Sequence, residues 1–120
     1  MKILAFTDMH ESLTALNRVK RKSKKSDIVV CCGDISIFGG GLEFMMEELS
    51  KIKKEIIVIH GNHEDENDMK KLCKAKNVHF IHKTKKKIND TLFIGYGGGG
   101  FNLEDPEFEK ITIKFEKWIK

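Results

Sequence analysis

Three apolar runs of the chain are each followed at once by a short polar cluster, and this arrangement restricts the fold more than any other feature. The runs are Lys2–Phe6, Asp27–Cys32 and Glu55–His60. Short runs rich in β-branched residues are typical of strands buried in a parallel sheet. The stretches between them have helical periodicity. The sequence therefore predicts an α/β layered fold, with a sheet flanked by helices.

Three helices are predicted between and after these strands. They run, in chain order, from the capping residue Ser12 to about Lys24, over Leu42–Lys51 and over Glu66–Lys76. The inward face of the first helix is expected to carry Leu13, Leu16 and Val19, at helical spacing. Met45, Met46 and Leu49 have the same spacing in the second helix and are expected to lie in the core.

The pattern changes after Asn77. A short strand is predicted at Val78–Ile81, followed by a hairpin of Lys86–Ile88 with Leu92–Tyr96 that turns at Asn89-Asp90. These strands suggest a mixed sheet. The glycine tract Gly97–Gly100 is either a structural hinge or a wall beside a phosphate site. A last helix is predicted to begin at Asp105-Pro106, because an Asp cap followed by Pro favours a helix start.

Length and composition limit the class of protein. With 120 residues, of which 40% are hydrophobic, residues 1–120 are expected to form a single domain. No apolar run approaches the roughly 20 residues of a membrane span, and the opening residues do not form a signal peptide. The three cysteines are interpreted as buried thiols in a reducing compartment. We therefore expect a cytoplasmic protein without a membrane partner.

The polar clusters contain the residues on which chemistry depends. They are Asp8-Met9-His10, Gly33-Asp34 and Gly61-Asn62-His63-Glu64. Loops at the carboxyl ends of parallel strands converge on one crevice, so we expect these clusters to meet. Asp, His and Asn side chains are ligands for manganese, iron or zinc. Asp34 can bridge two ions, and His63 is placed to act as a general acid or to stabilise a transition state.

Three motifs follow successive strands in this order: Asp8-x-His10, Gly33-Asp34 and Gly61-Asn62-His63-Glu64. Together they resemble the amino-terminal half of the calcineurin-like metallophosphoesterase family. The resemblance implies a hydrolase that cleaves phosphomonoesters or phosphodiesters with a metal-activated water. It implies a first divalent ion bound by Asp8, His10 and Asp34, and a second bound by Asp34 and Asn62. His63 would be the catalytic residue, assisting the transition state.

The sequence departs from the family pattern in one respect. The family supplies further histidines from a later Gly-His and a Gly-His-x-His segment, and neither motif is present in these 120 residues. We therefore expect an incomplete fold whose carboxyl half is missing, and a homo-oligomer or a second chain that supplies it. The alternative is a non-catalytic remnant that binds metal, phosphate or nucleic acid. The lysine-rich stretches 20–25 and 83–87 keep nucleic acid open as a partner.

Overall fold

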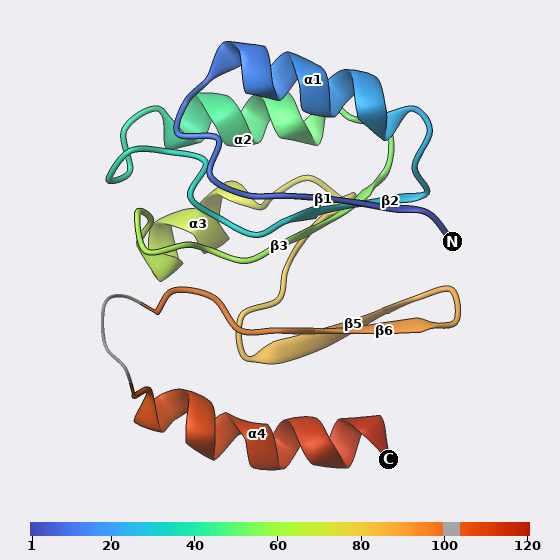
Figure 1. The fold of residues 1–120 in the computed structure, drawn as a ribbon, viewed down its shortest axis with the longest axis vertical. Coiled ribbons are helices and arrows are strands. Elements are labelled where there is room, and N and C mark those ends of the chain that lie inside the picture. Colours follow the sequence, from blue (N-terminus) through green and yellow to red (C-terminus); the bar gives the residue numbers. More distant parts are fainter. Residues whose placement is uncertain (100–103) are drawn as a thin grey trace.

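The computed structural model describes residues 1–99 and 104–120 as a stack of layers (Figure 1). Three helices cover one face of a four-stranded parallel sheet. A two-stranded antiparallel hairpin lies on the opposite face, and a last helix lies outside the hairpin. This arrangement confirms the predicted α/β layered class with flanking helices.

The parallel sheet has its strands in chain order. They are β1 (Ile3–Phe6), β2 (Ile28–Cys31), β3 (Glu55–Val58) and β4 (Val78–Phe80). The connecting helices are α1 (Leu13–Ser23), α2 (Leu42–Ser50) and α3 (Glu66–Leu72). Each strand is adjacent to the next one along the chain, so the carboxyl ends of all four point to the same edge. That edge is at the left of Figure 1.

Side-chain caps fix where the helices begin. The Ser12 hydroxyl accepts the backbone N–H of Ala15 at 3.1 Å and starts α1, as predicted. The Asp105 carboxylate accepts the N–H of Phe108 at 3.1 Å and starts α4 (Pro106–Ile119), again as predicted. In contrast, α3 ends at Leu72 and is shorter than predicted, since the chain must turn back to pair β4 with β3.

The main core lies between the sheet and helices α1 to α3. The fully buried side chains there include Leu16, Met45, Met46, Leu49 and Met69. The expectation that Leu13 faces inward is wrong, because its side chain is 56% exposed. It lies in the first turn of α1, and a spacing of three residues places it about 60° away from Leu16 around the helix axis.

The predicted hairpin is confirmed, as β5 (Thr84–Ile88) pairs with β6 (Thr91–Gly95). The sequence suggested that this hairpin would make the first sheet mixed. Instead it forms a second sheet beneath the first. Lys83 has a left-handed backbone (φ 59°) and bonds through its N–H to the Gly95 carbonyl at 2.8 Å, which turns the chain out of the first sheet. Ile28, Ile57 and Ile81 form a second core against this hairpin.

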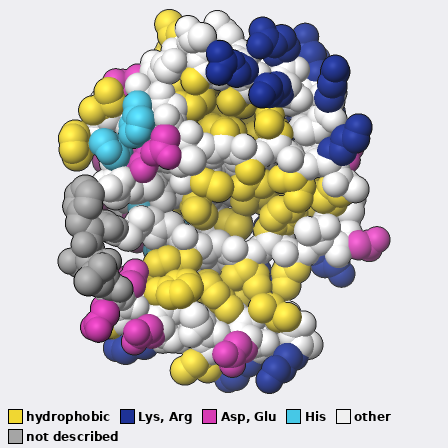
Figure 2. All heavy atoms as spheres, viewed as in Figure 1, with side chains coloured by type: hydrophobic (Ala, Val, Ile, Leu, Met, Phe, Trp, Pro, Cys, Tyr) yellow, Lys and Arg dark blue, Asp and Glu magenta, His cyan; other side chains and the backbone are white. Residues whose placement is uncertain are grey.

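The hairpin covers only part of the lower sheet face. Ile3 of β1, which alternates with the core-facing Leu4, is 47% exposed. Helix α4 has no buried residue, and its Ile113 and Ile119 are 60% and 71% exposed. Figure 2 shows hydrophobic side chains gathered between the layers on this side of the molecule. The described residues therefore leave apolar surface uncovered.

Candidate metal centre

The three polar clusters lie on three neighbouring loops at the carboxyl edge of the sheet. We call residues 7–12, which follow β1, the first motif loop. Residues 32–41, which follow β2, are the second, and residues 59–65, which follow β3, are the third. Since β1, β2 and β3 are adjacent and parallel, the loops begin side by side, as predicted for an open α/β sheet.

Backbone hydrogen bonds join the first and second motif loops. The N–H of Asp8 donates to the Gly33 carbonyl at 3.3 Å, and the N–H of His10 donates to the Asp34 carbonyl at 3.1 Å. Asp8, His10 and Asp34 all have left-handed backbone, with φ of 58°, 45° and 52°. Such conformations cost about 1–3 kcal/mol each outside glycine and concentrate at functional sites. All three candidate ligands of the first ion are therefore held in strained positions by their surroundings.

The buried carboxylate of Glu64 joins the second and third motif loops. Its Oε1 accepts the N–H groups of Asp34 at 2.7 Å and Gly61 at 3.0 Å. Its Oε2 accepts the Ser36 hydroxyl at 2.7 Å and the Ser36 N–H at 3.3 Å. A carboxylate that is 8% exposed needs such donors, because an unpaired buried charge is strongly destabilising. Glu64 was assigned no role from the sequence, although an acid in the short polar cluster after a buried strand was a signal for one.

Two glycines allow the second and third motif loops to approach each other. A Cβ on Gly33 would collide with the backbone nitrogen of Gly61, and a Cβ on Gly61 would collide with the Asp34 carboxylate. Gly33 also has a φ of 85°, in the left-handed region that favours glycine. Glycine at both positions therefore permits the close contact between the second and third motif loops.

The structure brings together four of the five predicted site residues. His10 Nε2 lies 3.4 Å from the Asp8 carboxylate, and the rings of His10 and His63 have centroids 4.9 Å apart. The N–H of His63 donates to Asp34 Oδ1 at 2.9 Å. The fifth, Asn62, is exposed on the same turn, between Gly61 and His63, and its side chain forms no hydrogen bond with the other four among the described residues.

The donor set fits a divalent ion by its chemistry, since carboxylate oxygen, imidazole nitrogen and amide oxygen suit manganese, iron or zinc. In the part of the chain that the structure describes, no three His, Cys, Asp or Glu side chains converge closely enough to enclose an ion. The side chains of Asp8, His10 and Asp34 therefore form an open set of donors.

His63 is oriented by the second motif loop. The backbone N–H of Phe38 donates to His63 Nδ1 at 3.4 Å, and the Phe38 ring lies 4.5 Å from the imidazole between centroids. When Nδ1 accepts a hydrogen bond, the proton of the neutral ring is on Nε2. The Phe38 side chain is 82% exposed. Its contact with His63 was not predicted from the sequence.

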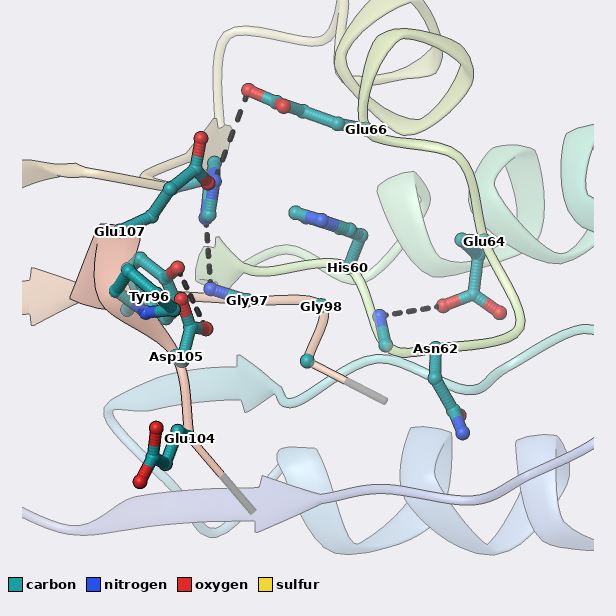
Figure 3. Close-up of a pocket in the computed structure, with 14 residues that line it drawn as sticks. His60, Asn62, Glu64, Glu66, Tyr96, Gly97, Gly98, Glu104, Asp105 and Glu107 are labelled. Atoms are coloured by element: carbon teal, nitrogen blue, oxygen red, sulfur yellow. Dashed lines mark hydrogen bonds and ion pairs between the residues drawn. The ribbon is translucent and has the colours of Figure 1, made fainter. Parts of the chain in front are cut away.

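A polar cavity of about 460 Å³ adjoins the third motif loop (Figure 3). His60 and His82 have ring centroids 4.6 Å apart on its wall. Burial lowers the pKa of both rings below the ordinary value of 6.5. The N–H of Gly97 donates to His82 Nδ1 at 2.9 Å, and the N–H of Gly98 donates to the His60 carbonyl at 2.7 Å. The start of the glycine tract is therefore anchored beside the cavity, while Gly100 lies outside the described residues.

The sequence model of a family described as calcineurin-like phosphoesterases matches residues 1–120. The chain belongs to this family. An uncharacterized protein of Methanocaldococcus jannaschii is 33% identical to it over 100 residues, which cover 82% of this chain and 44% of that protein. A protein of known crystal structure is 17% identical, with a TM-score of 0.78, over 99% of this chain and 65% of the other. At that identity the structural match supports the fold alone.

Membership of the calcineurin-like phosphoesterase family supports a phosphoesterase type of function and the use of divalent metal ions. The match begins at residue 1, in agreement with the predicted amino-terminal part of the family fold. The chain spans less than half of the archaeal relative and less than two thirds of the solved chain. None of the described helices is long and apolar enough to cross a membrane.

Proposed function

We propose that this chain contributes the amino-terminal part of a metal-dependent phosphoesterase site that hydrolyses phosphomonoesters or phosphodiesters. The observation that supports this most strongly is the position of Asp8, His10, Asp34 and His63 on three adjacent loops that contact one another. These loops are joined by backbone bonds and by the Glu64 carboxylate. Such joints hold side chains from distant parts of the sequence in fixed positions, as a catalytic site requires.

Asp8, His10 and Asp34 would hold the first ion, and Asp34 and Asn62 would hold the second. Two divalent ions, when bound, polarise the phosphoryl group and activate a water for attack on phosphorus. Asp34 is fixed for this role from two sides, because its N–H donates to Glu64 at 2.7 Å and its Oδ1 accepts the His63 N–H at 2.9 Å. Manganese, iron and zinc all suit this donor set.

His63 would act on the phosphoryl oxygens or the leaving group. Its Nδ1 accepts the Phe38 N–H, so the neutral ring presents an N–H at Nε2. A donor held in place near the phosphoryl group can stabilise developing charge or supply a proton to the departing alkoxide. We therefore assign His63 as the catalytic residue, distinct from the metal ligands.

Additional ligands would come from a polypeptide segment outside these 120 residues, either on the same protein or on a second chain. The family pattern has further histidines, and this chain matches only 44% of its archaeal relative. Such a segment, or a second copy of the chain, would cover the exposed apolar surface. This surface includes Ile3 on the lower sheet face and Ile113 and Ile119 on α4. A homo-oligomer or a complex with a second chain is accordingly part of the proposal.

A non-catalytic binding function is the second candidate, and one observation favours it. A hollow of about 330 Å³ at the other end of α1 is lined by Lys20, Lys24, Lys51, Lys53 and Lys54. Lysine ammonium groups around a hollow can bind the phosphates of a polyanion such as nucleic acid, and here Lys20 and Lys51 are also paired with Glu48. The hollow lies at the carboxyl ends of α1 and α2, away from the three motif loops, so it would act independently of the metal centre.

Hydrolysis of an aryl phosphodiester in the presence of manganese separates the two candidates. Slow turnover is expected from this chain alone, since its ligand set is open. That turnover should be lost in Asp34→Ala and His63→Ala, and it should rise when a polypeptide with the later family histidines is added. An inactive mixture that still binds manganese or oligonucleotide would favour the non-catalytic function.

A further inference from the structure

The polar cavity beside the third motif loop is lined by carboxylates. Glu66 from the start of α3 and Glu104, Asp105 and Glu107 from the start of α4 line it, so residues far apart in sequence converge (Figure 3). We call this space the acidic cavity. None of its described lining residues is Lys or Arg, and the sequence has no Lys or Arg between Gly97 and Glu107.

Local partners neutralise only part of this charge. Lys83 pairs with Glu107 at 3.1 Å, and Asp105 accepts the Tyr96 hydroxyl at 2.9 Å while capping α4. Glu66 lies 3.9 Å from His82 Nε2, a longer contact. The acidic cavity thus has a negative field, which attracts a cation and disfavours a polyanion.

A second, independent observation points to a ligand. His60 lines the acidic cavity, is only 8% exposed, and has no hydrogen-bond partner for its Nδ1 among the described residues. Figure 3 shows its ring extending between Glu66 and the loop after β6, which carries Gly97 and Gly98. Buried polar nitrogens nearly always have a partner, so an unpartnered one beside a cavity marks a place for a donor from outside the protein.

Gly97 and Gly98 keep this place open. A Cβ on Gly97 or on Gly98 would come within 2.9 Å of a ring nitrogen of His60. Any side chain there would press on the imidazole and fill the space beside it. Gly97 and Gly98 therefore form a thin wall of the cavity.

The acidic cavity adjoins the third motif loop and one proposed metal ligand, Asn62, while Asp8, His10, Asp34 and His63 are not among its described lining residues. Gly61 and Asn62 of the third motif loop also line it. A molecule bound in the cavity therefore lies next to Asn62, a proposed ligand of the second ion. A phosphoester bound at the metal centre would extend its alcohol portion into this space.

We propose that the acidic cavity receives the alcohol portion of the substrate, and that this portion carries a primary amino group in its cationic form. The ammonium N–H groups would donate to the Glu66 and Glu107 carboxylates and to the His60 imidazole. The substrate class is then an amine-bearing phosphoester rather than a nucleic acid. This inference rests on the proposed phosphoesterase function, which it makes more specific.

Calorimetry with two matched phosphates tests the inference. Phosphoethanolamine and 2-hydroxyethyl phosphate, in which a hydroxyl replaces the ammonium group, are titrated into the manganese-loaded protein. We expect phosphoethanolamine to bind about tenfold more tightly, because only its ammonium group is attracted by the carboxylates. The difference should vanish in Glu66→Gln/Glu107→Gln. It should persist in Glu109→Gln/Glu116→Gln, which removes the same charge from exposed positions of α4 outside the cavity.

A metal-free measurement separates this inference from the proposed function. Ethanolamine alone is added to Asp34→Ala, and the imidazole proton signals of His60 and His82 are followed by NMR. Shifts of these signals would support the acidic cavity even if the protein hydrolyses no phosphoester. Unmoved signals would overturn the inference, as would equal affinity for the two phosphates or tighter binding of a thymidine oligonucleotide than of phosphoethanolamine.

Discussion

The backbone N–H of Asp34 lies 2.7 Å from the carboxylate of Glu64, thirty residues later in the chain. This bond fixes the central candidate metal ligand to the loop that carries His63. The same carboxylate also holds Gly61 and Ser36. Glu64 therefore positions the site through the backbone of both loops without belonging to the predicted ligand set.

Glu64→Gln should destabilise the protein by about 3 kcal/mol. The amide that replaces one carboxylate oxygen carries N–H groups, so it would face backbone or hydroxyl donors instead of accepting from them. Urea unfolding of the variant measures the loss. Glu43→Gln, at an exposed position of α2, is the matched control and should change the free energy of unfolding by less than about 0.5 kcal/mol. Equal stabilities of the two variants would contradict a structural role for Glu64.

Gly61→Ala should weaken manganese binding about 10- to 100-fold, a range typical of disturbed outer-shell contacts. Its Cβ would collide with the Asp34 carboxylate and push that side chain from its position. Gly39→Ala is the control, because an added Cβ at Gly39 meets no atom within 4 Å, even though its φ of 86° strains an alanine there more than at Gly61. Unchanged manganese binding in both variants would show that the Asp34 carboxylate, which lies against Gly61, is not a metal ligand.

Stability should fall as the pH decreases through 6.5, in part because of His82. Burial keeps the pKa of His82 in the folded chain below 6.5, so near pH 6 the unfolded state binds more protons than the folded state. The contribution of His82 is complete above pH 6.5 and is lost towards the lower folded pKa. Urea midpoints at pH 7.5 and 5.5 measure the decrease, which should be smaller in His82→Gln. An unchanged decrease in the variant would exclude His82 as a source.

The isolated chain should self-associate at micromolar concentration or bind a hydrophobic dye. Ile3, Ile113 and Ile119 are each at least 47% exposed, and β1 lies at the edge of its sheet. Uncovered apolar side chains and a free strand edge both favour association. Sedimentation velocity of the wild type and of Ile113→Glu/Ile119→Glu measures the effect, and the variant should be less associated. A monomeric wild type without dye binding would show that the chain needs no partner.

The sequence predicted the strand and helix order well because periodicity and caps are local. Ser12 and Asp105 cap their helices as expected, and the turn at Asn89-Asp90 makes the hairpin. The position of the hairpin was not predicted. It depends on tertiary packing of Ile28, Ile57 and Ile81 against its underside, which no local pattern encodes.

The candidate site was only partly accessible from the sequence. Asp8, His10, Asp34 and His63 were found because each follows a strand, and topology then brings their loops together. Glu64 and Phe38 were missed as functional residues, since their roles depend on contacts between loops. His60 and His82 were not predicted as site residues, because only the fold shows that they share a cavity wall.

Calorimetric titration with manganese tests the proposed metal centre most directly. The wild-type chain should bind about one ion weakly, through Asp8, His10 and Asp34, and Asp34→Ala should abolish the binding. Asp68→Ala, which removes an exposed carboxylate from α3, should leave it unchanged. Manganese binding that survives in Asp34→Ala, or tight binding of two ions by the isolated monomer, would contradict an open site built on these three residues.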